Sequence, residues 1–302
     1  MDFRDLEYFA VLADHGHVGR AAEALGLSQP AVSLCLRRLE KSLGAKLVKR
    51  TPKGVELTEV GSALLSQVAR LRLAREDVVR EIADLTQGRV GNLRIGAHPG
   101  VVDDLLGPAC CALLKAAPKV ALTVAVEAND AAVIALREGR LDLIVNIIPA
   151  DSYKDIVHEH LMDDTMVVFA SADHRLAKRK QVTMEDLKHE RWTATAFSAP
   201  AWPHLNLAAK NSNINAPQVV AQTTSLTLRD HLVASTDLLG TSSRRVLRQS
   251  ATRHRIVELP VREFKAKRGV GVFYRKDAYL SPVARRFIEI LKITAKNIPS
   301  GA

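Results

Sequence analysis

The chain has 302 residues, of which 47% are hydrophobic, and a formal charge of +10 at neutral pH. This length exceeds that of one average domain and predicts two or three, and the positive charge favours an anionic partner. Three cysteines rule out a disulfide framework, and because neither an apolar signal region nor a run of about 18 apolar residues occurs, we expect a cytoplasmic protein without a membrane anchor.

The first helix is predicted from Phe3 to about Asp14. Asp2 can cap this helix, and Asp5 lies three residues further on, in the position of a capping box. Its apolar residues recur at helical spacing and predict a buried face. That face carries Leu6, Phe9, Ala10 and Ala13.

Two short helices joined by a tight turn are predicted between Val18 and Leu43. Gly26 ends the first of them, because glycine readily takes the left-handed conformation found at helix ends. Ser28 can cap the second, with Pro30 in its first turn. One apolar stripe at helical spacing predicts the buried face of this second helix. The stripe consists of Val32, Leu36, Leu39 and Leu43.

The opposite face of the second helix is slim and polar at its start and basic further on. It carries Gln29, Pro30, Ser33, Leu34, Arg37, Arg38 and Lys41. Glutamine can bond adenine at two points, serine can bond either base, and arginine can reach guanine or phosphates. Between residues 20 and 53, eight basic residues stand against two acidic ones. The pattern favours double-stranded DNA as the partner; the alternative is a helical hairpin with a solvated basic face.

Two short strands are predicted next, Leu47–Thr51 and Val55–Leu57, around Pro52-Lys53-Gly54. They form a β-hairpin directly after the helix pair. Basic residues on such a hairpin are placed to hold phosphates or to enter the minor groove. We therefore expect base reading by Gln29, Pro30, Ser33 and Leu34, and backbone contacts by Arg37, Arg38, Arg50, Thr51 and Lys53.

A helix of about 29 residues is predicted to run from its cap, Thr58, to Gln87. Apolar residues recur through it at coiled-coil spacing, with an interruption at Arg75. They are Leu64, Val68, Leu71, Val78, Ile82 and Leu85. Because a lone helix of this length cannot bury its stripe within so small a domain, the pattern favours pairing with a second copy of the chain. The alternative is packing on the C-terminal domain.

Two glycines in Gln87-Gly88-Arg89-Val90-Gly91-Asn92 indicate a linker, after which strands and helices alternate. Near-continuous apolar strands between helices predict a parallel sheet covered on both faces. The expected strands are 93–97, 121–126, 141–147, 165–170, 192–196, 218–222, 238–240 and 269–275. The expected helices are 101–116, 131–138, a short one opened by Thr183 and Asp186, 226–234, 244–249 and a last one from residue 281.

Several stretches of the first 61 residues resemble the winged helix-turn-helix of the LysR-type transcriptional regulators. They include Leu6-Glu7-Tyr8-Phe9, Arg20-Ala21-Ala22-Glu23-Ala24-Leu25, Ser28-Gln29-Pro30-Ala31-Val32-Ser33 and Leu57-Thr58-Glu59-Val60-Gly61. The chain departs from the family pattern at Leu34 and Cys35, where a basic or polar residue followed by Gln or His is usual. It also departs at His17 and Gly19, where Ser and Thr are usual, so we expect a weaker cap on the helix after them.

This resemblance implies a DNA-binding regulator that binds an interrupted palindrome as a dimer or tetramer, with RNA polymerase as a further candidate partner. It implies a multidomain fold: an N-terminal all-α winged helix-turn-helix (1–58), a linker and dimerisation helix (59–87) and a two-lobed, periplasmic-binding-protein-like α/β effector domain (88–302). We place the first lobe at 92–162 and 267–296 and the second at 163–266. The chain then crosses between lobes near Leu161–Asp164 and Glu263–Lys267.

The effector is expected where loops follow strands. In open α/β sheets ligands bind beyond the carboxyl ends of strands, and helix N-termini favour anions. These rules select His98, Pro99, Gly100, Val101, Asn129, Asn146, Phe197, Ser198, Thr224 and Ser225. We therefore expect a small, anionic effector in the cleft between the lobes; the alternative for each residue is ordinary turn chemistry.

Other interpretations have less support. Cys110-Cys111 could act as a redox sensor, but an apolar helix favours buried thiols, and Cys35 borders the apolar stripe. His158 and His160 share one side of a strand without a third metal ligand. No P-loop, Gly-x-Ser-x-Gly or HExxH motif occurs, so we expect no enzyme activity, cofactor or metal. Two alternatives remain open: a ligand-binding module whose N-terminal domain serves only assembly, and an enzyme on an α/β scaffold.

Overall fold

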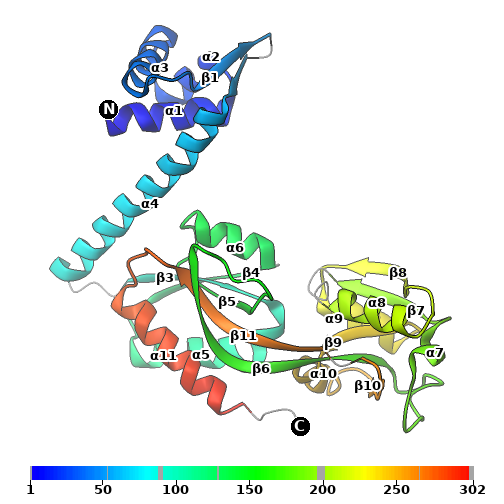
Figure 1. Cartoon of the computed structure of the whole chain (residues 1–302). Coiled ribbons are helices and arrows are strands. Elements are labelled where there is room, and N and C mark those ends of the chain that lie inside the picture. The colour runs from blue at the N-terminus through cyan, green and yellow to red at the C-terminus, as the bar shows by residue number, and fades with distance from the viewer. Residues whose placement is uncertain are drawn as a thin grey trace. The chain divides into compact units, whose positions relative to one another are not determined.

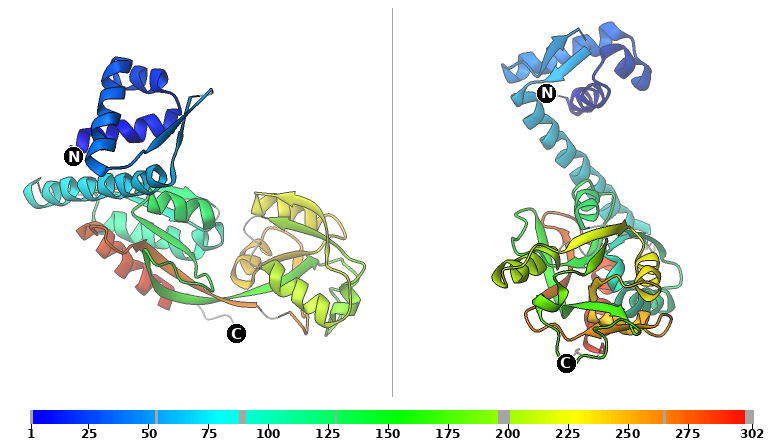
Figure 2. Two further views of the ribbon diagram at one scale, coloured as in Figure 1. Left: turned by 45° about the horizontal axis from the view of Figure 1, so that its top comes forward. Right: turned by 90° about the vertical axis from the view of Figure 1, so that its right-hand side faces the viewer.

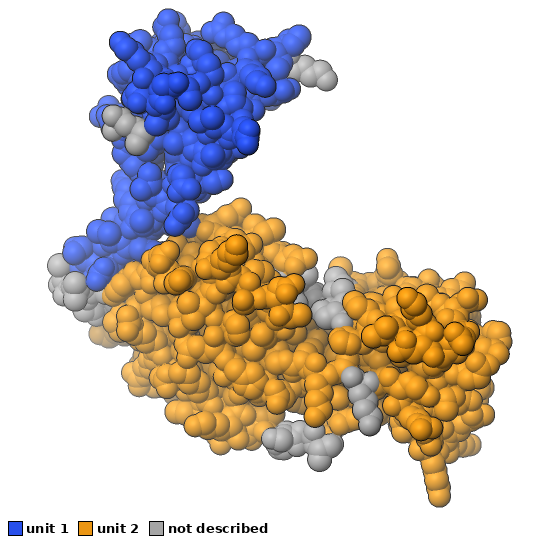
Figure 3. Space-filling view, viewed as in Figure 1, with its two compact units in different colours: residues 1–82 blue, residues 83–302 orange. Residues whose placement is uncertain are grey.

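The computed structural model describes residues 2–52, 54–87, 91–127, 129–195, 201–264 and 266–298. The chain forms two compact units, residues 1–82 and 83–302 (Figure 3). Each unit contains its own hydrophobic core. Within the described residues, none of the helices combines the length and hydrophobicity that a membrane span requires.

Three helices and a two-stranded hairpin form the head of the first unit (Figure 1). They are α1 (Phe3–His15), α2 (Val18–Leu25), α3 (Gln29–Leu43), β1 (Val48–Thr51) and β2 (Gly54–Leu57). Ser28 Oγ accepts a hydrogen bond from the N–H of Ala31 at 3.4 Å, and Gly26 and Gly44 end α2 and α3 in the left-handed conformation. The core beneath them consists of Leu6, Phe9, Ala10, Leu39, Leu47 and Val68.

The start of α2 differs from the expectation of a weak cap. The Nδ1 atom of His17 accepts a hydrogen bond from the N–H of Gly19 at 3.0 Å. An imidazole nitrogen can therefore satisfy an unpaired N–H at the helix start, as a serine or threonine hydroxyl would. Although His17 departs from the family pattern, α2 is therefore capped.

The hairpin is joined to the end of α1. The N–H of Val55 donates to the carbonyl oxygen of Gly16 at 2.8 Å. Gly54 has a φ of +135°, and a Cβ added there would stand 2.1 Å from the same Gly16 oxygen. Only glycine allows the two backbones to approach this closely.

The long helix α4 (Glu59–Gln87) has the predicted length, and Thr58 Oγ1 caps it by accepting from the N–H of Gly61 at 3.0 Å. Its first three turns pack Leu64 and Val68 against the head. Beyond them Leu71 is 44% exposed and Val78 is 57% exposed. The predicted stripe is thus buried at its start and exposed further along; the side chain of Leu85 lies outside the described residues.

The second unit contains two lobes that share one seven-stranded sheet of order β10-β6-β11-β5-β3-β4, with β9 also pairing with β6. The first lobe contains β3 (Asn92–Ala97), η1 (Pro99–Val101), η2 (Val102–Leu106), α5 (Gly107–Ala116), β4 (Ala121–Val126), α6 (Asn129–Arg137), β5 (Leu143–Ile147) and α11 (Pro282–Lys296). The second contains α7 (Met184–Leu187), β7 (Arg191–Thr195), α8 (Trp202–Asn211), β8 (Gln218–Thr223), α9 (Leu226–Ala234), β9 (Gly240–Ser243), α10 (Arg244–Ser250) and β10 (Ile256–Leu259).

Two long strands, β6 (Ile156–Ser171) and β11 (Ala266–Arg275), run side by side from one lobe into the other (Figures 1 and 2). They pair antiparallel from Ala266 and Met166 to Arg275 and Ile156. The prediction of a parallel sheet holds for β3, β4 and β5 and for the separate pair β7–β8. It was wrong for β6, β9, β10 and β11, which pair antiparallel. The predicted strands 165–170 and 269–275 were too short, because the polar alternation of residues 157–164 hides a strand that is half exposed.

Two other predicted elements change in the structure, and two elements were not predicted. The predicted helix 101–116 begins as a 3₁₀ turn and a π-turn, since Pro108 cannot donate and the N–H of Gly107 bonds Val102 five residues back. The strand predicted at 238–240 lies at 240–243. Helix α8 and strand β10 were not predicted; β10 is short, and α8 is bounded by a proline at its start rather than by a polar cap.

Candidate functional site

The outward face of α3 is exposed at its start. The exposed side chains include Gln29, Pro30, Leu34 and Arg37, and Ser33 is half-buried beside them. Leu34 is 52% exposed, so one apolar side chain interrupts an otherwise polar surface. Gln29 lies against α2, since a Cβ added to Gly19 would stand 3.0 Å from Gln29 Nε2. The glycine at this departure from the family pattern thus leaves room for Gln29.

Arg38 forms an ion pair with the carboxylate of Asp5. Asp5 is 5% exposed, and its carboxylate accepts hydrogen bonds from Arg38 Nε at 3.2 Å and from Arg38 Nη2. The carboxylate raises the pKa of Arg38, and burial raises the pKa of the neighbouring Cys35 thiol. Asp5 therefore joins α1 to α3 instead of closing the predicted capping box, while 57% of the Arg38 side chain stays exposed.

The hairpin presents basic side chains on the same unit. Lys49 and Arg50 on β1 are exposed. Thr51 is half-buried, and its Oγ1 donates to the carbonyl oxygen of Gly54 at 3.4 Å. Lys53 lies outside the described residues. The head thus combines an exposed helix face with an exposed basic strand, which is the chemistry that a DNA backbone requires.

A cavity of about 540 Å³ in the second unit lies between the lobes. Most of its wall is apolar, from Val133, Ile144, Ile147, Ile148, Pro149, Ala150, Met166, Ala266 and Phe273. The polar lining consists of Asp130, Asn146, Tyr153, His204, Lys267 and Arg268. A volume in this range and a mostly apolar wall with a few polar groups are typical of small-molecule sites.

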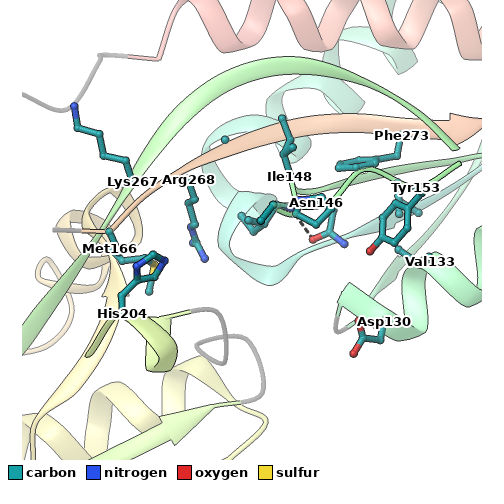
Figure 4. A pocket seen from close by; sticks show the side chains of 16 residues that line it. Asp130, Val133, Asn146, Ile148, Tyr153, Met166, His204, Lys267, Arg268 and Phe273 are labelled. Atoms are coloured by element: carbon teal, nitrogen blue, oxygen red, sulfur yellow. Dashed lines mark hydrogen bonds between the residues drawn. The ribbon is translucent and has the colours of Figure 1, made fainter. Parts of the chain in front are cut away.

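Arg268 extends from β11 into the space between Met166 and His204 on one side and Asn146 on the other, whereas Lys267 points the opposite way (Figure 4). Asn146 is 2% exposed and its Oδ1 accepts from the N–H of Ile147 at 2.8 Å. Arg268, Asn146 and His204 therefore approach one space from both lobes.

Four charged side chains form a hinge cluster where β6 and β11 cross between the lobes: Asp104, Asp164, Arg245 and Arg268. Asp164 has no exposed side-chain surface, and its Oδ2 accepts from Arg268 Nε at 2.9 Å. Its Oδ1 accepts from the hydroxyl of Ser243 at 2.6 Å. Arg245 donates to Asp104 of the first lobe. Burial raises the pKa of Asp104, although Arg245 opposes this, and burial lowers the pKa of Arg268.

A second, smaller cavity of about 20 Å³ adjoins this cluster. From the first lobe, His98 and Gly100 line it. From the second lobe and the crossing strands the lining consists of Met166, Thr195, Leu226, Arg229, Thr241, Ser242, Ser243, Val246 and Arg268. All three guanidinium nitrogens of Arg229 donate hydrogen bonds there, mainly to Asp230 and to the carbonyl oxygen of Thr241. The volume is enough for about one water-sized group.

Two family models match this chain over most of its length. One, described as "Bacterial regulatory helix-turn-helix protein, lysR family", matches residues 3–62, and the other, "LysR substrate binding domain", matches residues 86–296. The chain belongs to the LysR family. It is thus a DNA-binding transcriptional regulator of the LysR type, and its relatives are regulators rather than enzymes.

Individual relatives support the same family. Over 298 residues this LysR-family chain is 25% identical to the transcriptional regulator GbpR of Azospirillum brasilense, covering 97% of this chain and 86% of that protein. It is 34% identical to the dual regulator OxyR of Escherichia coli over 193 residues, which are 63% of this chain and 62% of that protein.

Solved structures of other LysR proteins share the fold. A full-length OxyR variant from Pseudomonas aeruginosa superimposes with a TM-score of 0.64 at 24% identity, covering 98% of this chain and 95% of that one. Full-length CbnR in complex with its target DNA superimposes with a TM-score of 0.64 at 21% identity, covering 97% of this chain and all of that one.

The predicted effector residues of this LysR-family chain separate into groups. Asn146 lines the larger cavity, and His98 and Gly100 line the smaller one. Val101 is instead fully buried in the first-lobe core. Neither cavity lining contains Pro99, Thr224 or Ser225; Ser225 caps α9 by accepting from the N–H of Leu228 at 3.2 Å. The side chain of Asn129 lies outside the described residues. Phe197 and Ser198 lie outside the described residues.

The charged residues of the cleft were not predicted from the sequence. Arg268 and Lys267 directly precede the predicted strand 269–275, so the strand boundary excluded them. A basic pair at the start of an apolar strand is a signal that could have identified them. Arg245 and Asp104 carry no such signal, because they lie 141 residues apart.

The remaining candidate groups form no site of their own. Cys110 is half-buried, but Cys111 is exposed, so the expectation of two buried thiols was wrong for Cys111. His160 binds Asp163 at 2.9 Å. No group of three potential metal ligands occurs within the described part of the chain.

Proposed function

We propose that this regulator binds an interrupted palindromic operator as a dimer or tetramer and responds to a small, anionic effector in the cleft between its two lobes. The observation that carries the effector proposal is the convergence of Arg268, Asn146 and apolar side chains of both lobes on one cavity of about 540 Å³. A ligand held between two lobes can favour one lobe arrangement over another.

The DNA contacts are assigned by exposure and chemistry. Gln29, Pro30, Ser33 and Leu34 are the base readers. Arg37, Arg38, Arg50, Thr51 and Lys53 are assigned to the backbone. Arg38 binds Asp5 within the head, so its phosphate contact uses the exposed part of the guanidinium.

Dimerisation is assigned to α4. Leu71 and Val78 lie on the predicted stripe and are 44% and 57% exposed in the single chain. A second copy that covers this stripe would remove the apolar surface from water. Pairing of two heads also raises affinity for DNA, because both half-sites are bound at once.

Control follows from coupling of the lobes to the heads. An effector that prefers one angle between the lobes would alter the spacing of the two heads, the bend of the DNA and access of RNA polymerase. A tenfold change in operator affinity requires about 1.4 kcal/mol of differential effector affinity.

Peroxide sensing, which the names of some relatives describe, would require a thiol that ionises readily. Burial raises the pKa of Cys110 and of Cys35 in this chain. A raised pKa lowers the thiolate fraction and hence the reactivity. Neither Cys110 nor Cys35 fits that requirement.

A footprint of the purified protein on the DNA upstream of its own gene tests the proposal. The expected result is a protected region that repeats on one face of the duplex and changes in extent when a cell metabolite extract is added. No protection at low salt would contradict operator binding. Protection that no extract alters would contradict the effector response.

Two substitutions test the assigned contacts. Ser33→Ala should weaken specific binding more than nonspecific binding, since serine contacts a base edge; equal losses would contradict base reading. Arg50→Ala should flatten the salt dependence of binding, since one phosphate contact is lost; an unchanged slope would remove Arg50 from the backbone contacts.

A further inference from the structure

Arg268 has a nitrogen without a partner at the boundary between the two cavities. Arg268 and Met166 line both cavities, so the cavities adjoin at these side chains. The Arg268 side chain is 10% exposed, and its Nε and Nη2 bind Asp164. Its Nη1 is buried and has no hydrogen-bond partner among the described residues. A buried guanidinium nitrogen without an acceptor is costly unless something else supplies one.

Other buried polar groups around the two cavities also lack hydrogen-bond partners, and most of them are donors. Nη2 of Arg245 and Oγ1 of Thr241 are also buried without a hydrogen-bond partner in the described part of the hinge, and Nε of Arg245 has only the ion-pair contact with Asp164 Oδ1 at 3.4 Å. Oδ1 of Asp104 is a buried acceptor without a hydrogen-bond partner. Donors thus outnumber acceptors around the two cavities. The group that best complements such a surplus carries only acceptors, as an ionised acid does.

We propose that Arg268 binds the carboxylate of a small organic acid whose apolar part fills the larger cavity. This assignment rests on the proposed effector response and identifies the effector by class. A carboxylate is planar and matches the guanidinium fork, so it can bind Arg268 while Asp164 keeps the other side of the fork. One carboxylate oxygen also fits the smaller cavity, which has room for about one water-sized group.

The lining of the larger cavity indicates the chemistry of the rest of the ligand. Val133, Ile144, Ile148 and Phe273 provide an apolar wall that suits an aromatic or branched aliphatic body. Tyr153 provides a hydroxyl for a polar substituent at the end away from Arg268 (Figure 4). A monocarboxylate with an apolar body therefore fits better than a sugar phosphate or an inorganic anion.

The position of the carboxylate links binding to the lobes. The smaller cavity is lined by Gly100 of the first lobe and by Ser242 of the second, and Arg268 lies on a strand that belongs to both. A carboxylate oxygen in this cavity would contact both lobes at once. Its affinity therefore depends on the angle between them, which is the differential affinity that regulation requires.

Isothermal titration calorimetry on the full-length protein tests the assignment with matched pairs of probes. Benzoate, phenylacetate and 4-methylpentanoate are each compared with the corresponding neutral amide, which keeps the shape and removes the charge. We expect at least one acid to bind about 10- to 100-fold more tightly than its amide. In Arg268→Gln this preference should disappear, while Arg268→Lys should retain part of it.

Two further variants separate recognition from folding. Asp164→Asn combined with Arg268→Gln removes both members of the buried pair, so no isolated charge remains, and it should also lose the preference for the acid. Arg262→Gln replaces an exposed arginine six positions away and should leave the preference unchanged. Circular dichroism confirms that each variant is folded.

Several outcomes would overturn the inference. The first two are equal affinity for acids and amides, and no binding of any acid at about 10 mM. The other two are an acid preference that survives Arg268→Gln, and displacement of the acids by inorganic phosphate. The operator footprint of the same preparations keeps this test separate from the proposed function. Protection of the operator without acid binding contradicts only this inference; Arg268-dependent acid binding without protection contradicts only operator binding.

Discussion

At the scale of single residues, the head depends on a few polar groups that are buried with their partners. Glu40 is 8% exposed; its Oε1 accepts from the N–H of Leu47 at 3.0 Å and its Oε2 from Lys46 Nζ at 2.7 Å. Burial alone would raise the pKa of Glu40, but these hydrogen bonds outweigh it and lower the pKa below the ordinary value of 4.5. Glu40 thus fixes the end of α3 to the start of the hairpin.

The lowered pKa predicts a pH-dependent effect of Glu40→Gln. A carboxylate with a depressed folded-state pKa stabilises the fold above its unfolded pKa of 4.5, and this contribution is lost as the pH falls through the folded value. Glu40→Gln should lower the free energy of unfolding of the head by about 1–3 kcal/mol at pH 7. Urea unfolding should show a smaller difference at about pH 3.5.

Glu56→Gln is the matched control, because Glu56 is an exposed glutamate on β2 of the same hairpin. It should change the free energy of unfolding by less than about 0.5 kcal/mol at either pH. A pH-independent loss in Glu40→Gln would show that its carboxylate is not the stabilising group.

Gly54→Ala is predicted to disrupt the hairpin. A Cβ at residue 54 would stand 2.1 Å from the Gly16 oxygen, and the φ of +135° is unfavourable for alanine. Gly26→Ala is the control, since Gly26 also has a positive φ, +64°, but has open space around it. Thermal unfolding and DNA titration should show a clearly larger loss for Gly54→Ala; equal losses would mean that the close contact with Gly16 is unimportant.

At the scale of elements, α4 differs along its length. Near its start Val68 is fully buried against the head, and further on Val78 and Val79 are 57% and 61% exposed. These two valines are adjacent and of similar exposure, yet only Val78 lies on the predicted coiled-coil stripe. They therefore distinguish specific pairing from a general effect of apolar surface.

Val78→Glu is expected to weaken dimerisation at least about 100-fold, because the charge would enter the paired stripe. Val79→Glu should change it less than about threefold. Sedimentation equilibrium of both variants at several concentrations measures the dissociation constants. Equal effects of the two substitutions, or none, would contradict pairing through the predicted stripe.

At the scale of the whole molecule, each unit has its own core. Leu39 lies in the core of the first unit and Phe287 in that of the second. The cores are separate among the described residues, so destabilising one should leave the other unchanged. Calorimetry should therefore resolve two unfolding transitions.

Leu39→Ala is predicted to destabilise one transition by about 2–5 kcal/mol, and Phe287→Ala the other by about 3–5 kcal/mol, through lost burial and the cavity left behind. Each variant is the control for the other. A single transition that both substitutions shift equally would show that the units unfold together.

Local chemistry made the head predictable from sequence. Ser28, Gly26 and Gly44 set helix ends through groups within a few residues, and the apolar stripes of α1, α3 and α4 follow helical spacing. Such signals act over about four or five residues, so they are legible in one sequence. The rule that ligands bind beyond strand ends likewise identified Asn146 and the turn at His98, both of which line a cavity.

Only the tertiary structure decided which polar groups act together. The sequence determined that a basic helix pair, a long apolar-striped helix and an α/β domain follow one another. It did not determine that Asp5 binds Arg38, 33 residues away, or that Arg245 reaches Asp104 across 141 residues. Pairing and burial depend on groups that folding brings together from distant parts of the chain, and neither spacing nor local propensity carries that information. The central place of Arg268 in the cleft arises from the pairing of β6 with β11, which only the folded chain establishes.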